Sequence, residues 1–283
     1  MNQHYKGIIA TIAAAVIWST GGLLVKLITL DAFTILFYRS LYAGLFFLIV
    51  FRREALQFDR RALLISVCYA PLLICFVSAT KLTTAANAIF LQYIAPAIVL
   101  IAEPYFLKTR LKRYNVITVV VCIAGLSMFL LEQKTQNNWW GDGIALLSGL
   151  FSAALILSLK ASNRSQQSSG ILLGNILVVL VTLPLFLQSG PATVSEHGML
   201  AFLGLIQIGL GYALFTYGQR RISAIESSLI AMLEPILNPV WVLIGYHEIP
   251  SAWSVAGGII IVMALSMRII YSASGKRASG ADI

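Results

Sequence analysis

Two charged side chains, Arg39 and Glu234, lie deep inside long apolar stretches of this sequence. A charge at the centre of a lipid bilayer costs at least ~2.5–3.5 kcal/mol, so each one needs a partner or a function. Counted from one shared membrane face at 1.5 Å per helical residue, Arg39 lies roughly 10 Å deep and Glu234 roughly 16 Å deep. Two roles stay open: the pair braces two helices as an ion pair, or each charge holds one end of a zwitterionic ligand. Glu234 is also placed to carry a coupling proton.

Aromatic and amide side chains accompany these charges inside the apolar stretches. A deep tyrosine offers an apolar ring and a hydroxyl group, which suits an amphipathic solute. The same residue types also serve ordinary helix packing, and polar side chains in membrane spans often bond only a neighbouring helix. We expect a substrate site that is lined by Trp18, Arg39, Asn87, Gln92, Tyr93, Tyr212, Glu234 and Asn238.

Two prolines interrupt the apolar stretches near their middle. Pro96 and Pro235 each remove one helical hydrogen bond, so the carbonyl groups of Gln92 and Ala231, four residues earlier, lose their partners. Such a position bends the helix, and its free carbonyl can face a cavity. We expect Pro96 and Pro235 to act as hinges for gating, with a plain helix kink as the alternative interpretation.

Ten apolar stretches must position these residues. Hydrophobic residues make up 59% of the 283 positions and charged residues only 11%, against about 25% charged in ordinary soluble domains. That composition excludes a soluble enzyme, a disordered chain and a disulfide scaffold. Because about 20 apolar residues form one membrane-crossing helix, the sequence predicts an all-α integral membrane protein with ten transmembrane helices, over residues 7–27, 32–51, 62–80, 83–105, 114–131, 143–160, 170–188, 199–218, 223–245 and 252–271.

The basic residues gather at alternate ends of these ten spans. If both termini are cytoplasmic, 16 of the 20 Lys and Arg residues fall on cytoplasmic ends and loops, three fall on outer ends, and Arg39 lies within a span. Lys and Arg favour the cytoplasmic side of a membrane, so the pattern predicts an N-in, C-in topology. Membrane lipids with anionic head groups are then the expected partners of the basic loops, and no nucleic-acid partner is expected.

The second half of the chain repeats the first. A shift of 139 positions places residues 71–96 on residues 210–235 and aligns the two mid-span prolines. We therefore divide the chain into two repeats, residues 1–135 and residues 136–283, with five spans each. Because five is odd, the repeats are expected to insert with opposite orientations. Inverted repeats of this kind allow alternating access around a site near the membrane midplane.

Six short motifs follow one another along these spans: Trp18-Ser19, Arg39, Ala85 to Pro96, Glu234-Pro235, Gly245 to Glu248, and Gly257. In these motifs and its ten spans the chain resembles the EamA-type transporters of the drug/metabolite transporter superfamily. The chain departs from the family pattern at Thr109. This position of the first repeat corresponds to Glu248 of the second, so the acidic residue is missing from the first repeat, which weakens a functional role for Glu248. The resemblance implies a carrier of small metabolites whose cavity is lined by spans one to four and six to nine, with spans five and ten packed away from the path.

From this resemblance we expect a multi-pass secondary transporter of the bacterial inner membrane that moves a small polar or zwitterionic metabolite, most often as an exporter of amino acids or related compounds. An importer of a small amine or choline-like cation is the alternative, because deep tyrosines would supply cation–π contacts. An intramembrane enzyme is a remote alternative, since no nucleophile with a nearby base is visible. We expect no cofactor, no metal site, and a monomer or homodimer, with the small residues of span ten packed against span five or a second copy.

Two further acidic residues, Glu103 and Glu226, lie near the cytoplasmic ends of their spans. We expect them to reach the membrane surface or to pair with Lys108 and Arg221. The histidines fall in tails and loops rather than within spans, so no histidine proton relay is predicted.

Overall fold

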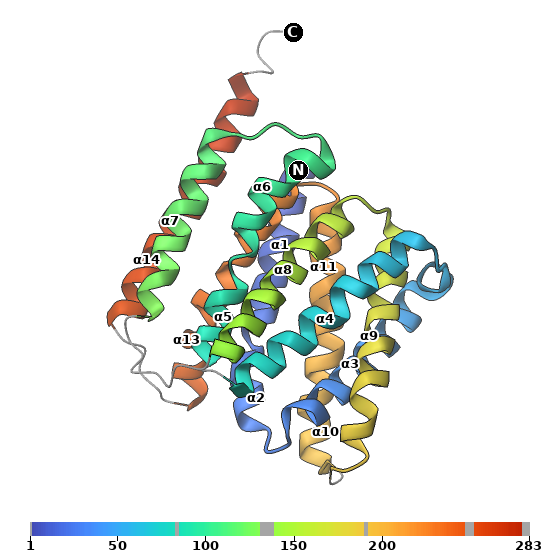
Figure 1. Ribbon diagram of the computed structural model, residues 1–283. Coiled ribbons are helices and arrows are strands. Elements are labelled where there is room, and N and C mark those ends of the chain that lie inside the picture. The colour runs from blue at the N-terminus through green and yellow to red at the C-terminus, as the bar shows by residue number, and fades with distance from the viewer. Residues whose placement is uncertain (1, 83–84, 131–138, 190–191, 247–251, 279–283) are drawn as a thin grey trace.

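The computed structural model of the chain is built from helices throughout its described residues, which are 2–82, 85–130, 139–189, 192–246 and 252–278 (Figure 1). A helix satisfies all of its backbone hydrogen bonds internally, which a chain in lipid requires. No strand occurs among the described residues.

The first half of the chain supplies the helices of five spans. Their bounds are α1 Gln3–Ser19, α2 Gly21–Leu27, α3 Ala32–Phe51, the short 3₁₀ helix η1 Arg52–Leu56, α4 Arg60–Leu82, α5 Ala85–Gln92, α6 Ala95–Leu107 and α7 Arg113–Leu130. The first span is divided into α1 and α2, and the fourth into α5 and α6.

The second half supplies five more spans. Their bounds are α8 Trp139–Lys160, α9 Arg164–Phe186, α10 Val194–Ala201, the π-helix η2 Phe202–Leu210, α11 Gly211–Gln219, α12 Ala224–Ala231, α13 Leu233–Tyr246 and α14 Ala252–Ala278. The eighth span runs through α10, η2 and α11, and the ninth through α12 and α13.

These helices account for the ten predicted spans. Within the described part of the chain, seven helical segments are long and apolar enough to cross a membrane, and three shorter apolar segments cover Ala95–Leu107, Arg113–Met128 and Val255–Tyr271. The prediction of an all-α membrane protein is therefore confirmed. The orientation of the spans stays a prediction.

Polar caps set several helix starts that hydropathy alone places differently. The eighth span was expected from residue 199, but its helix begins at Val194, because Thr193 and Glu196 form a capping box in which each side chain bonds the other residue's backbone N–H. Asn163 and Gln166 form the same arrangement at the start of α9. Such boxes satisfy backbone N–H groups that the first helical turn leaves free.

The packing of the helices recurs between the two halves. Helix α4, the third span, packs against α8 and α9. In the same way the eighth span packs against α1 through α11 and against α3 through η2. Helices α3 and α9 also pack against each other. This recurrence supports the division into repeats 1–135 and 136–283, which stays a prediction.

Helices α7 and α14 pack against one another at the edge of the molecule (Figure 1). At their contact, a Cβ on Gly125 would lie 2.7 Å from Ile261 Cγ1 and 3.0 Å from the carbonyl oxygen of Gly257. The small residues of span ten thus pack against span five, which was one of the two expected partners. The pair stands away from the centre of the helix bundle.

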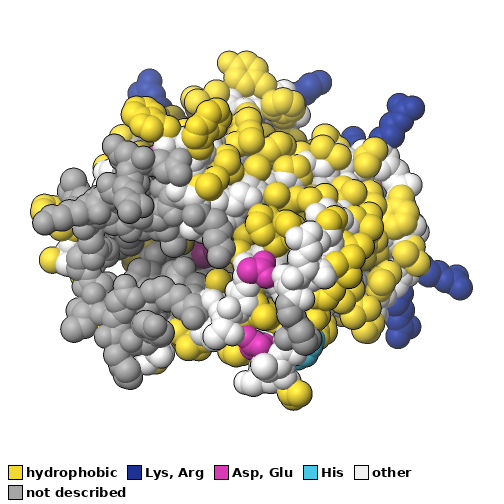
Figure 2. Space-filling view, turned by 60° about the horizontal axis from the view of Figure 1, so that its bottom comes forward, with side chains coloured by type: hydrophobic (Ala, Val, Ile, Leu, Met, Phe, Trp, Pro, Cys, Tyr) yellow, Lys and Arg dark blue, Asp and Glu magenta, His cyan; other side chains and the backbone are white. Residues whose placement is uncertain are grey.

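Many large hydrophobic side chains are exposed on the outer surface, as expected for helices that face lipid. Figure 2 brings forward the end of the molecule opposite to its termini, and there Asp and Glu side chains lie near the middle of the visible described surface while Lys and Arg side chains stand at its edges. Hydrophobic side chains are frequent over the rest of the described surface in this view. The distribution agrees with the assignment of this end to the outer side.

Candidate functional site

Spans four and nine are broken at corresponding positions. Helix α5 ends at Gln92 and α6 begins at Ala95, while α12 ends at Ala231 and α13 begins at Leu233. Pro96 and Pro235 therefore lie in the first turn of a new helix, where the missing N–H of proline leaves no partner unsatisfied. Two residues, Tyr93 and Ile94, interrupt the helix in span four, and one residue, Met232, interrupts it in span nine. These short interruptions are compatible with the expected kinks. The role of the two prolines as hinges stays a prediction.

Tyr93 connects the two broken spans. Tyr93 lies between α5 and α6, and its side chain is buried. Its hydroxyl group donates a hydrogen bond of 2.7 Å to the Glu234 carboxylate and lies 3.1 Å from the carbonyl oxygen of Ala231. The sequence predicted that the Ala231 carbonyl would lose its helical partner, and the hydroxyl of Tyr93 now faces it. The side chains of Tyr93 and Glu234, expected in one site, are thus in direct contact.

Arg39 lies on α3 and forms no ion pair with Glu234, although both side chains belong to the described part of the chain. The side chain is partly buried, and its Nε is buried without a hydrogen-bond partner. Its guanidinium lies within electrostatic range of Glu234 and of the hydroxyl groups of Tyr69 and Tyr212. The arrangement in this structure is therefore a pair of separated opposite charges.

An aromatic cluster lies beside these charges. The Trp18 ring on α1 is 5.0 Å from the ring of Tyr212 and 5.1 Å from that of Phe215, and the Tyr212 ring is 5.1 Å from that of Tyr69. Trp18 fits there because Gly211 offers no side chain, and a Cβ on Gly211 would collide with its indole ring. The indole Nε1 is buried without a hydrogen-bond partner. The structure thus brings Trp18 and Tyr212 together, as expected.

The three predicted amide residues are placed differently from one another. Gln92 is directed toward α8, where its Oε1 accepts a long hydrogen bond of 3.4 Å from the hydroxyl of Ser148. Asn238 is partly buried, one turn beyond Glu234 on α13. Asn87 belongs to α5, but its side chain lies outside what the structure describes.

The sequence did not assign Gln207 and Tyr69 to the site. Gln207 belongs to the π-helix η2; its Nε2 donates to the carbonyl oxygen of Trp18 at 2.9 Å, and its Oε1 is buried without a partner. The hydroxyl of Tyr69 donates to Oδ1 of Asn175 at 3.2 Å. A glutamine within an apolar run was the available signal for Gln207. The π-helix η2 is nine residues long, and π-helical segments inside α-helices frequently occur at functional sites.

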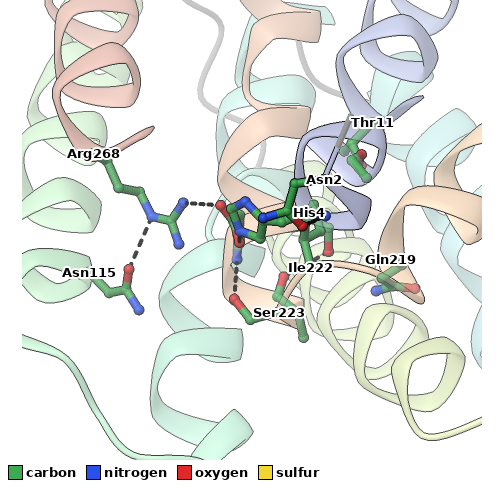
Figure 3. A network of polar contacts seen from close by, with 12 residues as sticks. Asn2, His4, Thr11, Asn115, Gln219, Ile222, Ser223 and Arg268 are labelled. Atoms are coloured by element: carbon green, nitrogen blue, oxygen red, sulfur yellow. Dashed lines mark hydrogen bonds and ion pairs between the residues drawn. The ribbon is translucent and has the colours of Figure 1, made fainter. Parts of the chain in front are cut away.

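A second polar cluster lies at the end of the molecule that holds both termini (Figure 3). Arg268 on α14 forms an ion pair of 3.1 Å with Glu226 on α12, and its Nε donates to Oδ1 of Asn115 on α7 at 3.0 Å. The other carboxylate oxygen of Glu226 lies 3.1 Å from Nε2 of His4 on α1. The buried carboxylate of Glu226 therefore joins α12 to α1 and α14, and Arg268 extends the cluster to α7.

The expected partners of Glu103 and Glu226 were wrong. Glu226 pairs with Arg268, while Arg221 lies over the ring of Tyr217 at 3.5 Å and donates to the carbonyl oxygen of Tyr217. Glu103 accepts hydrogen bonds from the first backbone N–H groups of α12, of 3.2 and 2.8 Å, rather than pairing with Lys108. A carboxylate is stabilised at a helix N-terminus by the free N–H groups and by the helix dipole.

Comparison with known proteins agrees with this architecture. Residues 5–131 and 139–269 match the EamA-like transporter family, which confirms the resemblance that the sequence motifs indicated. The pseudopaline exporter CntI of Pseudomonas aeruginosa is 26% identical over 92% of this chain and 94% of its own. The biotin transporter of Escherichia coli is 19% identical over 64% of this chain and 63% of its own.

A solved crystal structure has the same fold. It superposes with a TM-score of 0.78 over 95% of this chain and 98% of its own, at 15% sequence identity. At that identity the likeness concerns the fold alone.

Proposed function

Because the chain belongs to the EamA-like transporter family, we propose that it is a secondary carrier of a small zwitterionic metabolite. Membership makes it a multi-pass membrane protein and a transporter of a small molecule. The finer parts of the proposal are the charge pattern of the substrate, its outward movement, and the bacterial inner membrane as location. The relatives named above include an exporter, which favours the outward direction.

The observation that carries the substrate class is the separation of Arg39 from Glu234. A buried ion pair with both partners in contact would serve the fold alone, and breaking it would be costly. Here the guanidinium of Arg39 has no ionic partner among the described residues, and the carboxylate of Glu234 is held by a hydroxyl rather than by a cation. A substrate with one carboxylate and one ammonium group would satisfy both charges at once.

The residue types fit the two ends of such a substrate. A guanidinium group presents parallel N–H donors that match the two oxygens of a carboxylate. The Glu234 carboxylate accepts from an ammonium group. The rings of Trp18, Tyr212 and Phe215 supply an apolar wall for the carbon skeleton between them. Amino acids and related compounds have this combination of groups.

Alternating access is the proposed route. The two broken spans occupy corresponding positions in repeats 1–135 and 136–283, and discontinuous helices at the interface of inverted repeats form substrate sites in other secondary transporters. The Tyr93–Glu234 contact joins one broken span to the other. Movement of one repeat against the other would therefore change the site directly.

A counterflow assay with purified protein in liposomes tests the substrate class. Three solute sets are compared: amino acids, carboxylic acids without an amino group, and amines without a carboxylate. We expect exchange of the zwitterions alone. Arg39→Lys keeps the charge but loses the paired donors, so we expect affinity to fall roughly tenfold or more, while the control Arg53→Gln, an exposed residue of η1, leaves it unchanged.

The same assay decides the alternative of an amine or choline-like cation. The aromatic cluster around Trp18 favours that substrate, since rings attract cations through their faces. Arg39 disfavours a cationic substrate, because its positive guanidinium group lies within electrostatic range of Tyr212 in this cluster and would repel a cation there. If the protein exchanges amines that have no carboxylate, and Arg39→Lys does not change this exchange, then the substrate is a cation and the zwitterion proposal is wrong.

A further inference from the structure

A cleft of about 240 Å³ opens at the end of the molecule that holds both termini, at the polar cluster of Figure 3. It lies between the start of α1, the end of α6, the linker from α6 to α7, the start of α12, and α14. Its lining contains more basic than acidic side chains: Arg110, Lys112, Arg221 and Arg268 against Glu103 and Glu226. The cleft therefore carries net positive charge.

The two acidic groups do not cancel the remaining basic ones. Glu103 is occupied by the backbone N–H groups of α12, and Glu226 by Arg268. Arg110 and Lys112 are exposed, and neither forms an ion pair with any residue that the structure describes. The Lys112 ammonium group lies 5.7 Å from the centroid of the Tyr114 ring and forms no hydrogen bond with any described residue.

An apolar surface adjoins the linker of this cleft. Tyr105 and Phe106, in the last turn of α6, are 81% and 76% exposed, and Leu111 in the linker is 57% exposed. Aromatic residues at this position in a span lie at the level of the lipid head groups. A ligand at this place meets basic groups on one side and hydrocarbon on the other.

We propose that this cleft binds the phosphate group of an anionic phospholipid of the cytoplasmic leaflet. Basic pockets between transmembrane helices on the cytoplasmic side suit lipid phosphates. Arg110 and Lys112 bind the phosphate, and the acyl chains lie along Tyr105 and Phe106. Such a lipid joins the α6–α7 linker to the start of α12 and to α14, so its binding stabilises the folded protein.

The test compares two double variants of the purified full chain in detergent. Arg110→Gln with Lys112→Gln removes the two free cations of the cleft, while Arg53→Gln with Arg60→Gln removes two exposed cations on the same side but outside the cleft. Binding is measured by native mass spectrometry and by thermal stabilisation. The probes are phosphatidylglycerol, phosphatidylcholine, and soluble glycerol 3-phosphate.

We expect phosphatidylglycerol to bind the unchanged protein more tightly than phosphatidylcholine. The cleft variant should lose roughly tenfold or more in affinity for phosphatidylglycerol, because charge-assisted hydrogen bonds to the phosphate are lost, and the control variant only a few-fold. Equal losses in both variants would mean diffuse attraction to the basic surface and overturn the proposal. Equal stabilisation by glycerol 3-phosphate would assign the cleft to a soluble phosphate and overturn the lipid as its ligand.

Discussion

The hydroxyl group of Tyr93 lies 2.7 Å from a carboxylate oxygen of Glu234 and 3.1 Å from the carbonyl oxygen of Ala231. A tyrosine hydroxyl has one proton to donate. When Glu234 is ionised, that proton serves its carboxylate. When Glu234 is protonated, its own O–H can donate to the Tyr93 oxygen, and the Tyr93 proton then serves Ala231. Both protonation states are thus satisfied by hydrogen bonds, as a site for a coupling proton requires.

The first prediction concerns Glu234→Gln. The amide keeps the shape of the side chain and can donate to Tyr93, so we expect normal folding. The charge that holds an ammonium group or a coupling proton is gone, so transport should be abolished. Counterflow at several pH values, together with thermal unfolding of the same preparation, measures both effects.

Tyr93→Phe is the matched variant for this contact. It removes one hydrogen bond to a charged group, so we expect a loss of about 1.5–3 kcal/mol in the free energy of unfolding, together with an altered pH dependence of transport.

A wild-type rate and an unchanged pH profile in Glu234→Gln would remove Glu234 from the mechanism. The site would then reduce to its aromatic and amide lining.

The second prediction concerns topology. With an N-in, C-in orientation, the start of α10 faces outward and the linkers that carry Arg53 and Arg110 face the cytoplasm. Val194 is 91% exposed, so a cysteine there should react with an impermeant thiol reagent in intact cells, and cysteines at Arg53 and Arg110 should react only after lysis. The background replaces the three native cysteines, Cys68, Cys75 and Cys122. Reversed labelling at two of these positions contradicts the topology.

The fold was largely predictable because its main determinants are local in sequence. The length of an apolar run and the sign of the charges at its ends decide whether and how a segment crosses a bilayer. Pro96 and Pro235 also marked the breaks in spans four and nine, because the lack of a proline N–H is a property of one residue. Thr193 and Glu196 carried the spacing of a capping box, yet hydropathy placed that helix start five residues too late.

The pairing of polar side chains was not predictable in this way. Glu226 has a basic neighbour five residues away, Arg221, and the structure instead pairs it with Arg268, 42 residues away. That choice depends on where α14 lies relative to α12 in the folded chain, and no local pattern encodes it. The contact of Tyr93 with Glu234, across 141 residues, depends likewise on how two broken helices meet.

The third prediction concerns the α7–α14 pair. Gly125→Ala places a methyl group 2.7 Å from Ile261 Cγ1 and 3.0 Å from a backbone oxygen, so the two helices must separate. We expect a loss of roughly 1 kcal/mol or more in the free energy of unfolding. Because this pair stands away from Arg39 and Glu234, the affinity for substrate should not change.

Gly143→Ala is the control for that substitution. A Cβ on Gly143, which belongs to α8, meets no atom within 4 Å, and alanine favours the helix, so we expect a gain of roughly 0.4–1 kcal/mol. Thermal unfolding in detergent measures both variants. Equal stability of the two variants would contradict the close approach of α7 and α14.

The last prediction concerns Asp59, which lies outside the membrane-spanning segments just before α4. Its carboxylate accepts a hydrogen bond of 2.8 Å from the backbone N–H of Ala62 and one of 2.7 Å from the side-chain amide of Gln166 on α9. The bond from Ala62, followed by the bond from Gln166, lowers the pKa of Asp59 below its ordinary value of 3.8. A lowered pKa means that folding favours the ionised carboxylate.

The stabilisation by the ionised Asp59 is therefore complete at pH values above 3.8 and is lost as the pH falls through the lowered pKa of the folded protein. Asp59→Asn keeps a good helix cap but cannot ionise. We expect the unfolding temperature of wild-type protein to exceed that of Asp59→Asn at pH 6 and the difference to shrink progressively below pH 4. Thermal unfolding of both proteins across this range is the measurement. A difference that stays constant down to pH 2.5 would show that the charge of Asp59 contributes nothing, and that any effect of the substitution arises from hydrogen-bond geometry alone.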